Sequence, residues 1–132
     1  MTAAVYLDSS AVVKLAVPET ESAALRAFLA EVPWRVTSVI AQIESLRAVR
    51  RRALGPSEGR MQAVWQGLSW VALSAGVRRA AARLGPPELR SLDAIHLASA
   101  LELGPDLAGM IIYDARLAAA ARAAGIRVWA PQ

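Results

Sequence analysis

The sequence predicts an α/β fold in which helices cover both faces of a parallel β-sheet. Short β-prone runs alternate along the chain with longer helical patterns, the order that right-handed crossovers between parallel strands produce. Serines stand where several of these helices should begin, and prolines or glycines stand where they should end. The chain has 132 residues, of which 55% are hydrophobic. We therefore expect a single domain spanning residues 1–132.

The expected strands are short, apolar and rich in β-branched or aromatic residues. In chain order they are Ala3–Leu7, Trp34–Thr37, Ser69–Leu73, Met110–Tyr113 and Arg127–Ala130. In a sheet of this kind the active site lies beyond the carboxyl ends of the strands. Residues that directly follow a strand are therefore the first candidates for function.

The expected helices are recognised by their caps and by apolar residues at helical spacing, as at Ile40, Ile43 and Leu46. Serine caps are expected at three of them: Ser9 or Ser10 before Ala11–Val17, Ser38 before a helix that reaches Gly55-Pro56, and Ser91 before Leu92–Leu103. The other helical patterns lie at Glu19–Glu31, Ser57–Gly67, Ala75–Leu84 and Asp114–Ala124.

Four acidic residues that are distant in sequence are expected to meet at the carboxyl edge of the sheet. Asp8 ends the first strand and Asp114 ends the fourth. Asp93 lies in the first turn of a helix, and such a helix begins at the same edge when it follows a strand. Glu44 lies near the second turn of the helix that follows the Trp34 strand. The topology thus predicts a carboxylate cluster built from four separate segments.

The carboxylates of such a cluster repel one another, so a bound cation is expected. Two carboxylates about 5 Å apart repel by roughly 3 kcal/mol at an effective dielectric constant near 20. A folded site tolerates this only if a cation binds or some of the acids take up protons. The chain has no cysteine and one histidine, and an all-oxygen site favours Mg²⁺ or Mn²⁺ over zinc. An ion of this kind can activate a water for attack on a phosphodiester.

Each acid also has a purely structural interpretation. Asp8 and Asp114 could cap the helices that follow them, and Asp93 could stabilise a helix dipole. Glu44 could pair with Arg47, which lies three residues further along the same helix.

The composition excludes several classes of protein. Without cysteine there are no disulfides, no thiolate zinc sites and no cysteine nucleophile. A haloacid-dehalogenase-like phosphatase needs a second aspartate where Ser10 stands and a lysine late in the chain, and Lys14 is the only lysine. A response-regulator receiver also needs a lysine late in the chain, so it is excluded for the same reason. P-loop nucleotide-binding proteins are excluded because their glycine-rich loop is absent.

The charge balance suits a polyanionic partner. The net charge is +4, and the positive side consists of fourteen arginines and one lysine. A genome rich in arginine codons would give the same composition without any nucleic acid. The chain has neither a basic amino-terminal signal region nor about 18 consecutive apolar residues, so we expect a cytoplasmic protein.

Four segments of the chain carry a family resemblance. They are YLDSSAVVKL from Tyr6, IAQIESLRAV from Ile40, LRSLDAIHLASAL from Leu89 and YDARLAAAA from Tyr113. In this order and at this spacing they resemble the four motifs of the PIN-domain ribonucleases, and in particular the VapC-type toxins of bacterial toxin–antitoxin pairs. The resemblance covers nearly the whole chain. It differs at Ile112, where similar sequences often carry Thr or Ser two residues before the fourth acid.

The resemblance implies both a fold and a function. The fold would be a PIN-like three-layer one, with a five-stranded parallel sheet flanked by helices. The function would be that of a Mg²⁺-dependent endoribonuclease, in which Asp8, Glu44, Asp93 and Asp114 surround the metal and Ser10 helps to hold Asp8 or the water. The family also implies a homodimer and inhibition by an antitoxin whose tail occupies the acidic groove. The alternative is a catalytically degenerate PIN-fold protein that acts through a protein or RNA partner.

Two further features leave alternatives open. His96 lies three residues after Asp93 on the same side of its helix, and it could donate to an acid or a phosphate, or pack against a neighbouring backbone group. A basic stretch could bind RNA phosphates or the antitoxin, or form a solvated helix face. This stretch consists of Arg47, Arg50, Arg51 and Arg52.

Overall fold

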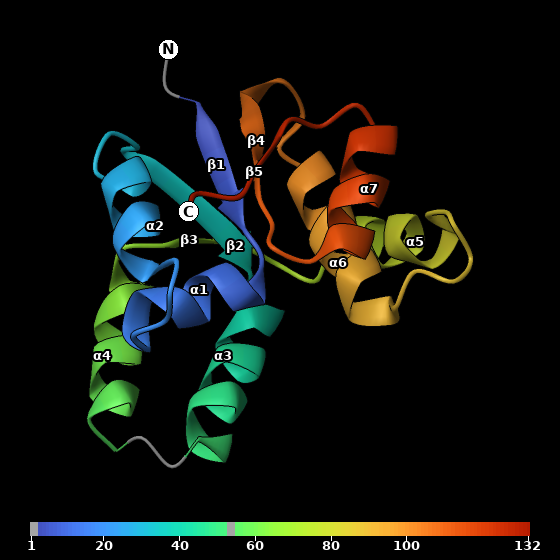
Figure 1. Ribbon diagram of the computed structural model, residues 1–132. Coiled ribbons are helices and arrows are strands. Elements are labelled where there is room, and N and C mark those ends of the chain that lie inside the picture. Colours follow the sequence, from blue (N-terminus) through green and yellow to red (C-terminus); the bar gives the residue numbers. More distant parts are fainter. Residues whose placement is uncertain (1–2, 53–54) are drawn as a thin grey trace.

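A five-stranded parallel sheet forms the middle layer of the computed structural model, which describes residues 3–52 and 55–132 (Figure 1). The strands are β1 (Ala4–Leu7), β2 (Trp34–Ser38), β3 (Ser69–Val71), β4 (Leu107–Ile111) and β5 (Val128–Trp129). Their order across the sheet is β3-β2-β1-β4-β5, so β1 lies at the centre. The predicted α/β fold with a five-stranded parallel sheet is confirmed.

Helices cover both faces of the sheet. They are α1 (Ser9–Ala16), α2 (Ser22–Leu29), α3 (Ile40–Arg51), α4 (Gly55–Gln66), α5 (Ala75–Arg83), α6 (Ser91–Leu101), α7 (Ala115–Ala123) and the short 3-10 helix η1 (Gly104–Asp106). Helices α1 to α4 lie on one side of the sheet, and α5 to α7 lie on the other (Figure 1). No helix of the described residues is long and apolar enough to cross a membrane.

The alternation of side chains along β1 builds both cores. Val5 and Leu7 belong to the apolar cluster under α1 and α2, whereas Ala4 and Tyr6 belong to the cluster under α6 and α7. All four residues are buried, as expected for a central strand covered on both faces. The sequence AVYL therefore forms a central strand, because the side chains on each of its two faces pack against a layer of helices.

The strand order places a crevice at the end of β1. From β1 the chain moves to β2 on one side of the sheet, and it later returns to β4 on the other side. The strand order therefore reverses between β1 and β4, which is where open parallel sheets bind ligands. Leu7 is paired with Ile111 in the register of these strands, and the Asp8 amide donates to the Ile111 carbonyl at 3.4 Å.

Three of the expected helix starts are wrong in detail. Asp8, rather than Ser9 or Ser10, is the N-cap of α1, because its carboxylate reaches the Ala11 amide. Ser91 is the first residue of α6 and not its cap. Ser38 lies before the N-cap position, although its hydroxyl accepts a hydrogen bond from the Ile40 amide at 3.3 Å.

Other element bounds also differ from the expectation. Helix α2 begins at Ser22 and not at Glu19, because the chain makes a turn there in which the Glu19 amide donates to the Ser22 hydroxyl. Helix α3 ends at Arg51, short of Gly55, which already begins α4. The expected boundary between these helices therefore falls partly on residues 53–54, outside the described residues. Helix η1 was not predicted.

Strand β4 runs over Leu107–Ile111 and not over Met110–Tyr113. The reason is Gly109, a residue type that weakens a strand prediction. A Cβ atom at this position would lie 2.6 Å from the Trp129 ring and 2.7 Å from the Arg127 carbonyl. The glycine therefore belongs inside the strand, because β5 approaches the backbone there too closely for any side chain.

Candidate active site

Asp8 lies directly after β1 at the point where the strand order reverses. Its side chain is only 5% exposed. One oxygen, Oδ1, accepts from the Ala11 amide at 3.0 Å and from the Ser10 hydroxyl at 2.9 Å. Burial raises the pKa of the Asp8 carboxyl, and the nearby Asp93 charge adds to the shift. The predicted contact between Ser10 and Asp8 is confirmed.

Glu44 is held by two donors. The Ser9 hydroxyl donates to Oε1 at 2.5 Å, and Nε2 of His96 lies 2.9 Å from the same oxygen. Burial raises the pKa of the Glu44 carboxyl, but the hydrogen bonds from His96 and Ser9 outweigh burial and leave it below its usual value. Glu44 is therefore ionised at neutral pH. Its alternative interpretation as a partner of Arg47 is wrong.

His96 connects this carboxylate to the core. It is 2% exposed, and its Nδ1 lies 2.7 Å from the hydroxyl of Tyr6. Burial raises the pKa of Tyr6 far above its usual range, so its hydroxyl keeps its proton and shares a buried hydrogen bond with Nδ1. At the other side of the ring, Nε2 donates to Glu44, because an ionised carboxylate can only accept. The interpretation of His96 as a donor to an acid is confirmed, and the backbone contact is wrong.

Tyr6 is a site residue that the sequence analysis missed. It lies in β1 two residues before Asp8, and its hydroxyl is deep in the molecule. A tyrosine within a fully buried strand needs a polar partner, and that requirement was the available signal.

Asp93 lies in the first turn of α6 with its side chain 17% exposed. Its Oδ2 is 3.2 Å from Nε of Arg90, whose side chain is 68% exposed. A pair that is open to solvent contributes little to stability. The charge of Asp93 raises the pKa of Asp8, so the two carboxylates lie close enough to interact, although α6 follows α5 and not a strand.

Asp114 is the N-cap of α7, and its Oδ2 accepts from the Leu117 amide at 2.9 Å. Its structural interpretation is thereby confirmed. This role leaves the other carboxylate oxygen available, so a part in metal binding stays a prediction. Ile112, two residues earlier, is fully buried in the cluster under α6 and α7.

The four acids do not form a closed metal cage. Across residues 3–52 and 55–132, no three histidine or acidic side chains are grouped closely enough to hold one metal ion. Two of them still suit Mg²⁺, which is commonly bound through one or two carboxylates and keeps several waters. Asp8 is the best-placed ligand, because both of its hydrogen bonds within the described residues go to Oδ1 and none goes to Oδ2. Asp93 is the second carboxylate of the proposed pair, because its charge raises the pKa of Asp8.

Two of the four arginines in the basic stretch at the end of α3 form ion pairs. Arg50 pairs with Glu58 at 3.1 Å, and Arg52 pairs with Glu19 at 2.7 Å. Arg47 and Arg51 line a groove together with Ile43, which is 63% exposed rather than part of the buried face that the helical spacing suggested. Binding of RNA or antitoxin by these arginines stays a prediction.

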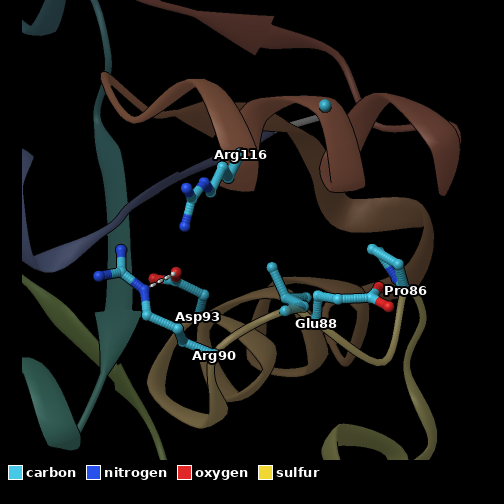
Figure 2. Close-up of a pocket in the computed structure, with 7 residues that line it drawn as sticks. Pro86, Glu88, Arg90, Asp93 and Arg116 are labelled. Atoms are coloured by element: carbon cyan, nitrogen blue, oxygen red, sulfur yellow. Dashed lines mark hydrogen bonds and ion pairs between the residues drawn. The ribbon is translucent and has the colours of Figure 1, made fainter.

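A cavity of about 430 Å³ opens beside Asp93 (Figure 2). The segment before α6 forms one side of it, with Pro86, Glu88, Leu89 and Arg90. Helix α7 forms the other side, and the Arg116 side chain points from this helix toward Asp93. The cavity therefore adjoins the carboxylate site directly.

Comparison with known proteins settles the family. A family model of the PIN domain matches residues 5–123. The chain belongs to the PIN-domain family. Its relatives include Ribonuclease VapC46 of Mycobacterium tuberculosis, which is 44% identical over 98% of this chain and 98% of that protein. Ribonuclease VapC35 of the same species is 41% identical over 96% of each. The resemblance to VapC-type PIN domains is thus confirmed.

Solved structures show the same fold. VapC20 from Mycobacterium tuberculosis, described as a toxin that cleaves the sarcin-ricin loop, matches with a TM-score of 0.74 and 18% identity over 93% of this chain and 96% of that one. A toxin–antitoxin complex from Klebsiella pneumoniae matches with a TM-score of 0.71 and 21% identity, over 97% and 98%. These likenesses confirm the three-layer PIN fold.

Proposed function

We propose that this PIN domain is a metal-dependent endoribonuclease and the toxin of a toxin–antitoxin pair. The observation that carries the proposal is Asp8, a carboxylate buried at the switch point of the sheet beside a second acid, Asp93. Burying a charge next to a like charge is costly unless a cation binds there. Relatives named as ribonucleases across nearly the full chain support RNA as the substrate.

Asp8 and Asp93 would hold the ion, with Mg²⁺ favoured and Mn²⁺ able to substitute. A divalent cation bound there would supply a nucleophilic water for in-line attack and stabilise the charge on the leaving oxygen. Ser10 holds Oδ1 of Asp8, which directs Oδ2 to the site. Asp114 as a further ligand is part of the same proposal.

Glu44 would orient the attacking water. Its Oε1 is occupied by Ser9 and His96, and Oε2 has no hydrogen bond among the described residues. Because its pKa is lowered, the carboxylate stays ionised and Oε2 can accept a hydrogen bond from the water. Tyr6 and His96 keep it in that position.

The partner of the toxin would be an antitoxin that presents a basic side chain to the acidic site. An arginine suits best, since its guanidinium can bridge two carboxylates. The Klebsiella pneumoniae structure, a toxin–antitoxin complex on the same fold, supports an antitoxin as the partner. The toxin expressed alone should slow growth, and Asp8→Asn should abolish that effect. A homodimer and a cytoplasmic location are parts of the proposal that also await tests.

Incubation with total cellular RNA tests the activity. The purified chain should cut a restricted set of RNAs with Mg²⁺, and it should cut none with excess chelator or as the Asp8→Asn variant. Sequencing of the new ends identifies the substrate. Cleavage at full rate in chelator, or by Asp8→Asn, would overturn the metal mechanism.

One observation favours a second candidate, a PIN-fold binding protein without catalysis. It is the lack, in the described part of the chain, of three side chains grouped for one metal ion. This candidate predicts RNA or antitoxin binding with no cleavage at any Mg²⁺ or Mn²⁺ concentration. The same RNA digest therefore separates the two functions.

A further inference from the structure

The cavity beside Asp93 has two unlike ends. At the Asp93 end, Arg116 points in from α7, and the Arg90 side chain lies on the other side of Asp93, to which its Nε is paired (Figure 2). At the other end lie Pro86 and the carboxylate of Glu88 (Figure 2). The positive groups are thus collected at the side that adjoins the carboxylate site.

Both arginines have donors left to bind an anion. Within residues 3–52 and 55–132, no carboxylate lies within ion-pairing distance of Arg116. Arg90 uses only Nε to contact Asp93, and no hydrogen bond to its two terminal nitrogens is found in that part of the chain. The forked donors of a guanidinium match the oxygens of a phosphate, which an RNA substrate would bring to this end of the cavity.

Besides the two arginines and the carboxylates of Asp93 and Glu88, the lining is apolar. Leu89 is half-buried, and Pro86 and Ala119 complete the walls. A volume of about 430 Å³ falls in the range of small-molecule sites, roughly 300–1,000 Å³. An apolar surface that ends in guanidinium groups suits an unstacked base with its phosphate.

We propose that this cavity binds the nucleotide next to the scissile phosphodiester, with its phosphate at Arg116 and Arg90 and its base against Leu89 and Pro86. The inference rests on the proposed function, since it takes RNA as the substrate. It assigns to Arg116 a role in substrate binding, which makes this arginine a determinant of affinity rather than of the chemical step.

Binding measured in chelator tests the proposal without any cleavage. The probe is a short fluorescein-labelled single-stranded RNA, followed by fluorescence anisotropy. Arg116→Ala is compared with Arg122→Ala, which removes the same charge from the same helix at an exposed position outside the cavity. Arg116→Ala should weaken binding about tenfold more than Arg122→Ala. It should also reduce the slope of log affinity against log salt by about 0.7.

A second pair of variants tests the base. Ala119→Phe fills the cavity from an exposed position on α7, and Ala119→Ser leaves it open. Ala119→Phe should raise KM for RNA cleavage several-fold with little change in kcat, and Ala119→Ser should change neither. Melting temperatures of all four variants verify that they are folded.

The outcomes are distinct from those of the activity test. If Arg116→Ala and Arg122→Ala bind RNA equally well, the nucleotide site is refuted even where cleavage proceeds. If Arg116→Ala impairs only the complex with an antitoxin, the cavity is a protein contact and the proposal is overturned. If RNA binding depends on Arg116 but no cleavage occurs, the nucleotide site is supported and the catalytic function fails.

Discussion

Replacing the buried charge of Asp8 should stabilise the metal-free protein. Asn can accept the same hydrogen bond from the Ala11 amide, so Asp8→Asn keeps the cap of α1. It removes a charge whose burial raises the pKa of the carboxyl. Removal of a buried charge that has no cation partner should therefore raise the unfolding free energy by an amount on the order of 1 kcal/mol.

Asp8→Ala is the matched control, because it removes the charge and the cap together. The lost cap costs about 1 kcal/mol, so the Asn variant should be more stable than the Ala variant by at least that amount. Urea denaturation of the parent and both variants in chelator supplies the three free energies. Equal destabilisation by Asn and Ala at neutral pH would show that the Asp8 charge stabilises the fold, and the reasoning would fail.

The advantage of Asp8→Asn should depend on pH. Because the pKa of Asp8 is raised in the folded state above its ordinary 3.8, the folded protein binds more protons than the unfolded chain just above that value. The parent therefore loses stability as the pH rises from about 3.8 through the folded pKa, and the variant does not. The two proteins should converge in stability at lower pH. If the difference in unfolding free energy between the parent and Asp8→Asn did not change with pH, the Asp8 charge could not be its source.

Three other substitutions probe separate parts of the structure. Tyr6→Phe should cost about 1–3 kcal/mol of unfolding free energy, because it leaves Nδ1 of His96 unpaired, and it should also slow RNA cleavage. If Tyr6→Phe changes neither the unfolding free energy nor the cleavage rate, His96 has no positioning role. Asp93→Asn should melt higher than the parent in chelator and gain less from added Mg²⁺; destabilisation in chelator with the full Mg²⁺ increment would exclude Asp93 from the metal site. Gly109→Ala should cost at least about 1–3 kcal/mol by thermal unfolding, since its Cβ would lie 2.6 Å from the Trp129 ring, and an unchanged melting temperature would contradict that close packing.

The position of Asp8 could be predicted because topology alone decides it. Asp8 follows a strand that is apolar on both faces, and such strands lie at the centre of parallel sheets. The carboxyl ends of parallel strands share one edge, so the position of Asp8 depends on strand order and not on side-chain detail. Asp93 differs, because α6 follows α5 and not a strand, and its position depends on how these helices pack.

The partners of the acids could not be predicted in the same way. The bond between Tyr6 and His96 joins residues 90 positions apart and depends on how α6 packs over β1. Glu44 could pair with Arg47 within its helix or with a distant donor, and the burial of His96 decides for the distant one. Local spacing shows which pairs are possible, whereas packing selects among them.

Strand β4 and the Arg116 cavity show the same limit. Gly109 weakens a strand prediction when it is considered alone, and only the approach of β5 explains why it is required. Arg116 is one of fourteen arginines; it lies two residues after Asp114, but that position alone does not show that its side chain lines a cavity. Its direction toward Asp93 follows from how α7 lies against the segment before α6.

Analysis of the cleaved RNA ends tests the central claim most directly. The purified protein is incubated with cellular RNA and Mg²⁺, and the termini of the first products are identified by their reactivity to ligation and phosphatase. Hydrolysis by water at the carboxylate site predicts 5′-phosphate and 3′-hydroxyl ends, with no products when Mg²⁺ is chelated. Primary products that carry 2′,3′-cyclic phosphates and form equally well in chelator would contradict a metal-dependent site built on Asp8 and Asp93.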